Sequence, residues 1–168
     1  MGTTVTKIDD IITDVIAKEG GAKVTNDPLD GGKRTQYGVS ETANAQAWAD
    51  GRVTEKEARE IYLQKYVINQ GFHKIPPSHA KVQSQLIDFG VNSGPQLAVM
   101  KLQGLLDVEV DGVLGPQTLG ALVAQEPREI NNRLVVARVE MVCRLVQKQP
   151  VQTRFLLGWV NRALGFLA

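Results

Sequence analysis

The sequence predicts a mainly α-helical protein with an irregular loop or small β-hairpin near residues 22–39. Apolar residues recur at helical spacing in several segments, and no alternation of strands with helices is present. Prolines precede the apolar runs of the second half, at the position where a helix start accepts proline. The chain has 168 residues, of which 43% are hydrophobic and 22% charged, so it can bury a core.

The first predicted helix is amphipathic and ends at a glycine pair. Its apolar residues follow the spacing of one helix face; they are Ile8, Ile11, Ile12, Val15 and Ile16. Gly20 and Gly21 supply the backbone freedom that favours a helix end. Glu19 therefore lies at the end of this helix, on its apolar side.

Turn residues, namely Asn26-Asp27-Pro28 and Asp30-Gly31-Gly32, dominate the next segment. Ser40 is a good N-cap, so we expect helices to resume after it. Thr54 and Glu57 fit a capping box that opens a further helix, and Ser78 is expected to cap another. Prolines at first helical positions then mark four helix starts; they are Pro95, Pro116, Pro127 and Pro150. A soft boundary is expected near residues 91–95.

Bulk properties exclude several classes of protein. The net charge is +1, from 19 basic and 18 acidic residues, so no binding to nucleic acid is predicted. No apolar stretch is long enough to span a membrane, and the N-terminus lacks the pattern of a signal peptide. We therefore expect a protein made and held in a cytoplasm. The single cysteine, Cys143, is interpreted as a buried, inert thiol.

No metal or cofactor is predicted. His73 and His79 are too few and too isolated for a zinc site. The acidic run that starts at Asp107 lacks the glutamate that a calcium loop needs at its twelfth position, where Thr118 stands.

Glu19 is the first candidate for chemistry. Burial and the negative end of a helix dipole both disfavour a charged carboxylate, and a glycosidase needs a carboxyl that can donate a proton. An exposed glutamate before a glycine stop would have the same sequence. Asp30 and Thr35 follow in the loop, where a second carboxylate, roughly 6.5–9.5 Å away, could activate water in an inverting glycosidase. Asp30-Gly31 could equally be a simple turn.

These residues carry a resemblance to a known family. Lys18-Glu19-Gly20-Gly21 and the run from Asn26 through Asp30-Gly31-Gly32 to Thr35 and Gly38-Val39 resemble the opening signature of family 108 glycoside hydrolases. Those enzymes are N-acetylmuramidases, many of them phage endolysins. The resemblance implies a lysozyme-like fold with Glu19 as the catalytic acid. The Glu–Asp–Thr order is similar to that of phage-type lysozymes, which suggests Asp30 and Thr35 for the other catalytic roles.

Two positions depart from that family's pattern. Ala22 stands where an aromatic residue often follows Glu-Gly-Gly, and Gln36 stands where asparagine is common. Neither change removes an expected catalytic group, but both could alter contacts with the substrate.

The second half is similar to the predicted peptidoglycan-binding segment of the same family. The matching residues are Leu102-Gln103, the run from Asp111-Gly112 through Gly115-Pro116 to Leu119, and Gly158–Arg162. The Asp-Gly motif is either architectural or a direct glycan contact. The resemblance thus implies a catalytic region over residues 1–91 and a helical binding region over 92–168, packed against the first.

Other polar and aromatic residues are candidates for substrate binding. Tyr37 shares the loop with Thr35 and Gln36. Trp48 and Tyr62 could each offer a flat face to a sugar ring or belong to the core. Asp88 and Asn92 lie in a stretch that is also characteristic of the family. Asn92 could equally be a helix stop.

The expected function is that of an endolysin which hydrolyses the β-1,4 bond between N-acetylmuramic acid and N-acetylglucosamine without a cofactor. The alternatives are a lytic transglycosylase and a non-catalytic protein that binds the cell wall or assists secretion. The expected partner is bacterial peptidoglycan. We also expect a monomer that stays in the host cytoplasm until a holin-like partner releases it to the periplasm or wall.

Overall fold

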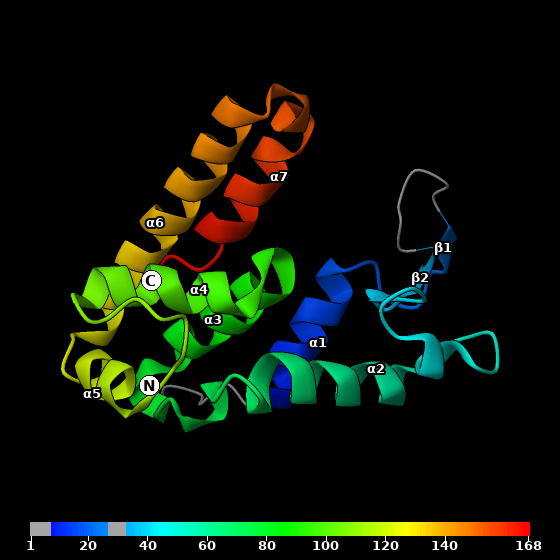
Figure 1. The fold of residues 1–168 in the computed structure, drawn as a ribbon, viewed down its shortest axis with the longest axis horizontal. Coiled ribbons are helices and arrows are strands. Elements are labelled where there is room, and N and C mark those ends of the chain that lie inside the picture. The colour runs from blue at the N-terminus through cyan, green and yellow to red at the C-terminus, as the bar shows by residue number, and fades with distance from the viewer. Residues whose placement is uncertain (1–7, 27–32) are drawn as a thin grey trace. The chain divides into compact units, whose positions relative to one another are not determined.

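The computed structural model describes residues 8–26 and 33–168, and over these residues the fold is mainly α-helical with one small antiparallel sheet (Figure 1). The predicted fold class is confirmed. The chain divides into two compact units, Met1–Asn69 and Gln70–Ala168, which we call unit 1 and unit 2.

Unit 1 begins with the predicted amphipathic helix, α1 (Ile8–Lys18). Its buried residues are those of the predicted apolar face; they are Ile11, Ile12, Val15 and Ile16. The helix ends where glycines reverse the backbone, with φ values of 94° at Gly20 and 57° at Gly21. The prediction of this helix and of its glycine stop is confirmed.

The predicted hairpin is present as part of a three-stranded sheet. β1 (Thr25–Asn26) pairs with β2 (Arg34–Gln36), which pairs with β3 (Val39–Ser40). Gln36 lies opposite Val39, so Tyr37 and Gly38 alone form the connection between β2 and β3. Both have positive φ, 52° and 74°, as a type I′ turn requires.

Ser40 does not cap a helix, so that prediction is wrong. It belongs to β3 and lies opposite Thr35 in the sheet. A short 3₁₀ helix, η1 (Ala45–Trp48), follows the sheet, and the next α-helix starts later. Strand pairing, which capping propensity does not include, decides the conformation of this segment.

The predicted capping box opens α2 (Glu55–Leu63) and is confirmed. The Thr54 side chain accepts from the Glu57 amide, and the Glu57 carboxylate accepts from the Thr54 amide. Ala58 and Tyr62 form the buried face of α2, and the helix continues into a π-helical turn, η2 (Gln64–Ile68). Arg59 of α2 bonds to α1 through Asp9 Oδ1 at 3.1 Å.

All the regular secondary structure among the described residues of unit 2 is helical. Two 3₁₀ turns open it, and a third precedes the last helix. Its elements are η3 (Phe72–Lys74), η4 (Pro77–His79), α3 (Ala80–Ser93), α4 (Pro95–Leu106), α5 (Pro116–Val123), α6 (Pro127–Lys148), η5 (Pro150–Gln152) and α7 (Thr153–Leu164). All four predicted proline starts are confirmed, since α4, α5, α6 and η5 each begin with proline.

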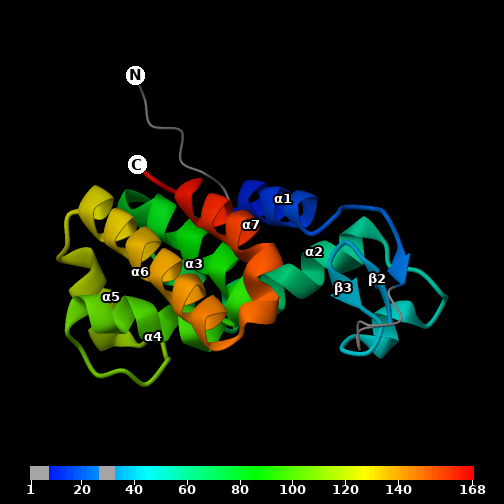
Figure 2. The same cartoon turned by 90° about the horizontal axis from the view of Figure 1, so that it is seen from above.

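The helices of unit 2 share one core. α6 and α7 run antiparallel, side by side (Figure 1), and α3 packs against both α4 and α6 (Figure 2). Ser78 is not the cap of α3, so that prediction is wrong. It lies inside η4, where its hydroxyl is 3.0 Å from Nδ1 of His79, and α3 starts at Ala80. Cys143 is half-buried instead of buried, and it forms no disulfide.

Within the described ranges, no helix combines the length and the apolarity that crossing a bilayer requires.

Candidate active site

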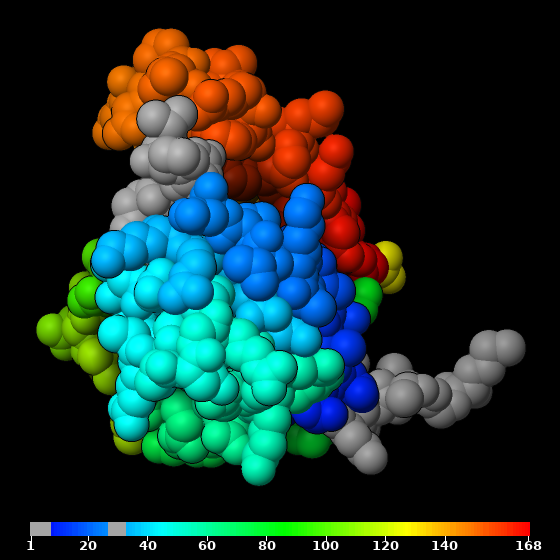
Figure 3. Space-filling model, turned by 90° about the vertical axis from the view of Figure 1, so that its right-hand side faces the viewer, coloured from blue at the N-terminus to red at the C-terminus, as the bar shows by residue number. Residues whose placement is uncertain are grey.

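Glu19 is fixed at the exit of α1. Its amide still donates to the Val15 carbonyl at 3.0 Å, so the last turn of the helix holds its backbone. The side chain is half-buried, and its Oε1 atom is shielded from solvent. The segment that follows α1, bright blue in Figure 3, lies at the surface of unit 1. Glu19 thus has a fixed backbone close to a surface that a large substrate can reach.

The turn between β2 and β3 lies directly against Glu19. A Cβ atom at Gly38 would stand 2.8 Å from Cβ and 3.1 Å from Cγ of Glu19, and it would overlap the hydroxyl of Tyr62. Contacts shorter than 3.0 Å to a Cβ atom do not occur without movement of the neighbour. Only glycine therefore fits between Glu19 and Tyr62.

Hydrogen bonds tie this turn to α2 and to the segment that follows α1. The Tyr37 amide donates to the Gly21 carbonyl at 2.8 Å, just beyond the end of α1. The Tyr62 hydroxyl, on α2, donates to the Tyr37 carbonyl at 3.1 Å. The structure thus brings together Glu19 and Tyr37, two of the predicted site residues, and adds Gly38 and Tyr62.

Gln36 braces the segment after Glu19. Its Nε2 donates to the Ala22 carbonyl at 3.1 Å, and its Oε1 accepts from the Val53 amide at 3.0 Å. Both ends of the amide are therefore engaged within unit 1. Thr35 is half-buried in β2, and its side chain lies on the opposite face of the strand from its neighbours Arg34 and Gln36.

Trp48 packs in unit 1 beneath Arg34. Its ring is 4% exposed, its Nε1 donates to the Val39 carbonyl at 3.2 Å, and the Arg34 guanidinium lies 4.8 Å from the ring centroid. Arg34 also donates to both oxygens of Glu41, at 3.0 and 2.9 Å. These hydrogen bonds lower the pKa of Glu41. The structure gives Trp48 a packing role, with one ring face covered by a cation.

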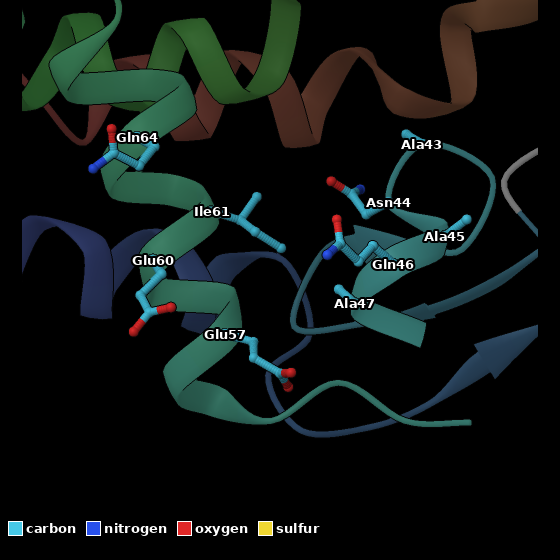
Figure 4. A pocket seen from close by; sticks show the side chains of 9 residues that line it. All are labelled: Ala43, Asn44, Ala45, Gln46, Ala47, Glu57, Glu60, Ile61 and Gln64. Atoms are coloured by element: carbon cyan, nitrogen blue, oxygen red, sulfur yellow. The ribbon is translucent and has the colours of Figure 1, made fainter. Parts of the chain in front are cut away.

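A groove with a volume of about 620 Å³ lies elsewhere on unit 1, between α2 and the segment of residues 43–47 (Figure 4). Glu57 and Ile61 project from α2 towards that segment, which contributes Asn44 and Gln46 (Figure 4). The Nδ2 atom of Asn44 donates to the Ser40 carbonyl, which leaves its Oδ1 as an acceptor. The groove can bind polar groups, but neither Glu19 nor Thr35 lines it.

Asp88 and Asn92, both predicted to bind substrate, belong to α3 of unit 2. Asp88 is 1% exposed and accepts from Arg138 of α6 at 2.7 Å and from Arg162 of α7 at 3.1 Å. Burial lowers the pKa of Arg138, and the Asp88 charge opposes that shift. Asp88 thus joins three helices. Asn92 is half-buried and accepts from the neighbouring Ser93 hydroxyl at 3.3 Å.

The Asp-Gly motif of the second half encloses a buried glutamine. Gln103 of α4 donates to Asp111 Oδ1 at 2.7 Å and to Thr118 Oγ1 at 3.0 Å, and it accepts from the Gly112 amide at 2.8 Å. The hydrogen bond from Gln103 lowers the pKa of Asp111. These hydrogen bonds give the motif an architectural role, which is one of the two roles that the sequence left open. Direct contact with glycan stays a prediction.

Asp30, the predicted partner carboxylate, lies outside the described residues. The assignments of Glu19, Thr35, Gln36, Tyr37 and Trp48 to catalysis or binding stay predictions. Over residues 8–26 and 33–168, no group of three or more histidine, cysteine, aspartate or glutamate side chains forms a site for a metal ion.

Sequence reasoning missed Gly38 and placed Tyr62 only as an aromatic face or a core residue. A residue followed by glycine between two short strands is a hairpin signal that would have drawn attention to Tyr37-Gly38.

Two family models match successive parts of the chain. Residues 12–94 match the family model described as Glycosyl hydrolase 108, and residues 97–164 match one described as Predicted Peptidoglycan domain. Among solved structures, SagA of Brucella abortus is similar, with 30% identity, a TM-score of 0.68 and coverage of 92% of each chain. No curated protein matches the chain.

Proposed function

The chain belongs to the glycosyl hydrolase 108 family, and from this premise we propose that Glu19 is the acid with which it cleaves the β-1,4 bond between N-acetylmuramic acid and N-acetylglucosamine. The family and the C-terminal region together make the protein a glycoside hydrolase that acts on peptidoglycan. The identity of the cleaved bond and the role of Glu19 as the acid are what we propose.

The position of Glu19 carries the proposal. Its backbone is fixed by the last turn of α1, one carboxyl oxygen is shielded from solvent, and Gly38 packs against Cβ and Cγ. A general acid must be held in place beside the sugar oxygen that it protonates. The surface position of the following segment supports access for a long glycan (Figure 3).

In the proposed reaction, the Glu19 carboxyl donates its proton to the oxygen of the leaving sugar. Asp30 accepts a proton from water as the water attacks the anomeric carbon from the opposite face, and Thr35 helps to hold that water. One glycosidic bond breaks, one bond to water oxygen forms, and the product carries a reducing N-acetylmuramic acid end. No cofactor enters this scheme.

Replacement of the acid tests the proposal. Glu19→Gln keeps the size of the side chain but removes the proton, so release of reducing ends from purified peptidoglycan should fall by about 100-fold or more, with an unchanged circular dichroism spectrum. Glu55→Gln, which alters an exposed ion pair of α2, is the matched control and should stay active. Near-normal hydrolysis by Glu19→Gln would refute Glu19 as the acid.

Mass spectrometry of the digest separates this reaction from that of a lytic transglycosylase. Hydrolysis leaves reducing N-acetylmuramic acid, whereas transglycosylation leaves an anhydro end. Anhydro products, together with an active Asp30→Ala variant, would replace the hydrolase with a transglycosylase.

The endolysin role, the cytoplasmic location before release and the holin-like partner belong to the same proposal. The resemblance of the Glu19 signature to that of phage endolysins supports them. Expression in a bacterial host should leave cells intact until the inner membrane is permeabilised, and lysis without permeabilisation would contradict dependence on a release partner.

A further inference from the structure

The turn beside Glu19 contains a tyrosine in a strained conformation. Tyr37 has a φ of 52°, a region that glycine and asparagine adopt readily and other residues avoid. It is the first residue of a type I′ turn, where asparagine or glycine is strongly preferred. Strain of this kind persists only where surrounding contacts impose it, and it concentrates at functional sites.

The contacts that impose this conformation come from α2 and from the segment that follows α1. Gly21, two residues beyond Glu19, accepts from the Tyr37 amide at 2.8 Å. Tyr62 is 3% exposed, and its hydroxyl donates to the Tyr37 carbonyl at 3.1 Å. The ring of Tyr62 lies beside that of Tyr66, with ring centroids 5.6 Å apart. The amide of Tyr37 is thus hydrogen-bonded to the segment that follows α1, and its carbonyl is hydrogen-bonded to α2.

Gly38 transmits the position of this turn to Glu19. Its Cα approaches so closely that a Cβ would stand 2.8 Å from Glu19 Cβ and 3.1 Å from Glu19 Cγ. A backbone in contact with these two atoms limits rotation about the side-chain bonds of the glutamate. Displacement of the turn would therefore release the carboxyl from its present rotamer.

We propose that Tyr62 is a positioning residue for the cleavage reaction, because its hydroxyl holds the Tyr37–Gly38 turn against the Glu19 side chain. The inference rests on the proposed function of Glu19. Tyr62 need not touch the substrate. Its loss should therefore affect the chemical step more than the binding of the glycan, since small displacements of a reacting group are costly.

Tyr62→Phe removes only the hydroxyl and is the primary test. The rate constant kcat for cleavage of soluble glycan oligomers should fall about ten- to hundredfold, while KM stays within about twofold. Tyr66→Phe is the matched control, because it removes a hydroxyl from the stacked neighbour of Tyr62 and should leave kcat unchanged. The fraction of folded protein is measured for each variant by circular dichroism.

Two results would overturn the inference. One is a Tyr62→Phe variant with the same kcat as Tyr66→Phe. The other is a lowered Tm with unchanged kcat per folded molecule, which would make the hydroxyl merely structural. Glu19→Gln is assayed alongside. If it is active, both the proposed function and this inference fail; if it is inactive while Tyr62→Phe is normal, only this inference fails.

A double variant examines the contact geometry. Gly38→Ala introduces a methyl group that overlaps the Tyr62 hydroxyl and crowds Glu19 Cβ. Adding Tyr62→Phe removes the first clash but not the second, so Tm should partly recover while kcat stays low. Recovery of kcat together with Tm would contradict the role of Gly38 in placing Glu19.

Discussion

Buried charged and amide side chains join the helices of unit 2, whereas Arg34 and Gln36, which brace unit 1, are only half-buried. Apart from the aromatic Trp48 and Tyr62 of unit 1, the buried side chains with hydrogen-bonding groups among the described residues belong to unit 2; they are His79, Gln83, Gln85, Asp88, Gln103, Thr118, Asn131 and Arg138. In unit 1, the partly exposed Arg34 and Gln36 reach the backbone of Gly51, Ala22 and Val53.

This difference separates stability from function. A buried polar group that loses its partner keeps its full desolvation cost. Single changes to the buried polar side chains of unit 2 should therefore lower the free energy of unfolding strongly. Water replaces the hydrogen bonds of exposed side chains, so the loss of one exposed polar side chain of unit 1 should lower the free energy of unfolding only slightly. The candidate acid lies in unit 1, which tolerates the strained Tyr37 turn beside it. We infer that unit 1 depends on many weak local contacts to position its site.

The largest predicted effect is the loss of the Asp88 charge. Asp88→Asn keeps the shape of the side chain but leaves Arg138 and Arg162 without their shared carboxylate inside unit 2. Breaking a buried ion pair costs about 3–5 kcal/mol of unfolding free energy. Urea unfolding followed by far-ultraviolet circular dichroism measures the loss.

A surface pair of the same unit provides the control for Asp88. Glu140 and Arg144 lie 3.4 Å apart with side chains 59% and 73% exposed, so Glu140→Gln should cost less than about 0.5 kcal/mol. Equal losses in the Asp88 and Glu140 variants would show that burial does not set the difference between the two pairs.

A glycine pair in unit 2 tests the architectural role of the Asp-Gly motif. Gly112 has a φ of 76°, and a Cβ there would meet Gln96 Cγ at 2.5 Å. Gly112→Ala should therefore cost about 2 kcal/mol, from backbone strain and crowding together. Gly104, in α4, has nothing within 4 Å of a Cβ, so Gly104→Ala should be neutral or stabilise unit 2 by up to about 1 kcal/mol.

The two alanine variants are compared by their urea midpoints. A Gly112→Ala protein that is as stable as Gly104→Ala would mean that the motif does not need glycine for its shape. Its presence would then be better explained by contact with glycan. Binding of each variant to insoluble peptidoglycan, measured by co-sedimentation, distinguishes these roles directly.

Sequence patterns correctly predicted the elements that depend on residues close together in the chain. The amphipathic face of α1, the capping box of α2 and the four proline starts depend on residues within a turn or two of one another. Ser40 and Ser78 have equally good capping chemistry, yet strand pairing and a 3₁₀ turn place them elsewhere. Strand pairing overrode the capping preference at Ser40, and a local 3₁₀ turn overrode it at Ser78.

The surroundings of the candidate acid could not be predicted in this way. Glu19 is recognisable from its signature, but Gly38 and Tyr62 reach it from distant parts of the chain. The family resemblance suggested substrate binding for Asp88, whereas its observed partners, Arg138 and Arg162, come from two helices far along the sequence. A single sequence shows residue types, whereas these roles depend on contacts between separate elements.

The smallest predicted effect lies in unit 1, at the start of α2. The Glu57 carboxylate accepts from the Thr54 amide at 2.8 Å and from the Thr54 hydroxyl at 2.6 Å. The hydrogen bond from the Thr54 side chain lowers the pKa of Glu57 below its ordinary value. The charged form is thus favoured in the folded state, so its contribution to stability is present above the ordinary pKa and is lost as pH falls through the lowered value.

Glu57→Gln should accordingly lower the urea midpoint of unit 1 at pH 7 and have a smaller effect at pH 3. Fluorescence of Trp48, the tryptophan of unit 1, reports this unit alone when Trp159 of unit 2 is replaced by phenylalanine. Thr54→Ala removes the two bonds of the Thr54 hydroxyl and should cost about 1 kcal/mol, and adding Glu57→Gln to it should cost less than Glu57→Gln alone. An effect of Glu57→Gln that is equal at both pH values, or fully additive with Thr54→Ala, would mean that Thr54 and Glu57 do not stabilise unit 1 through their mutual hydrogen bonds.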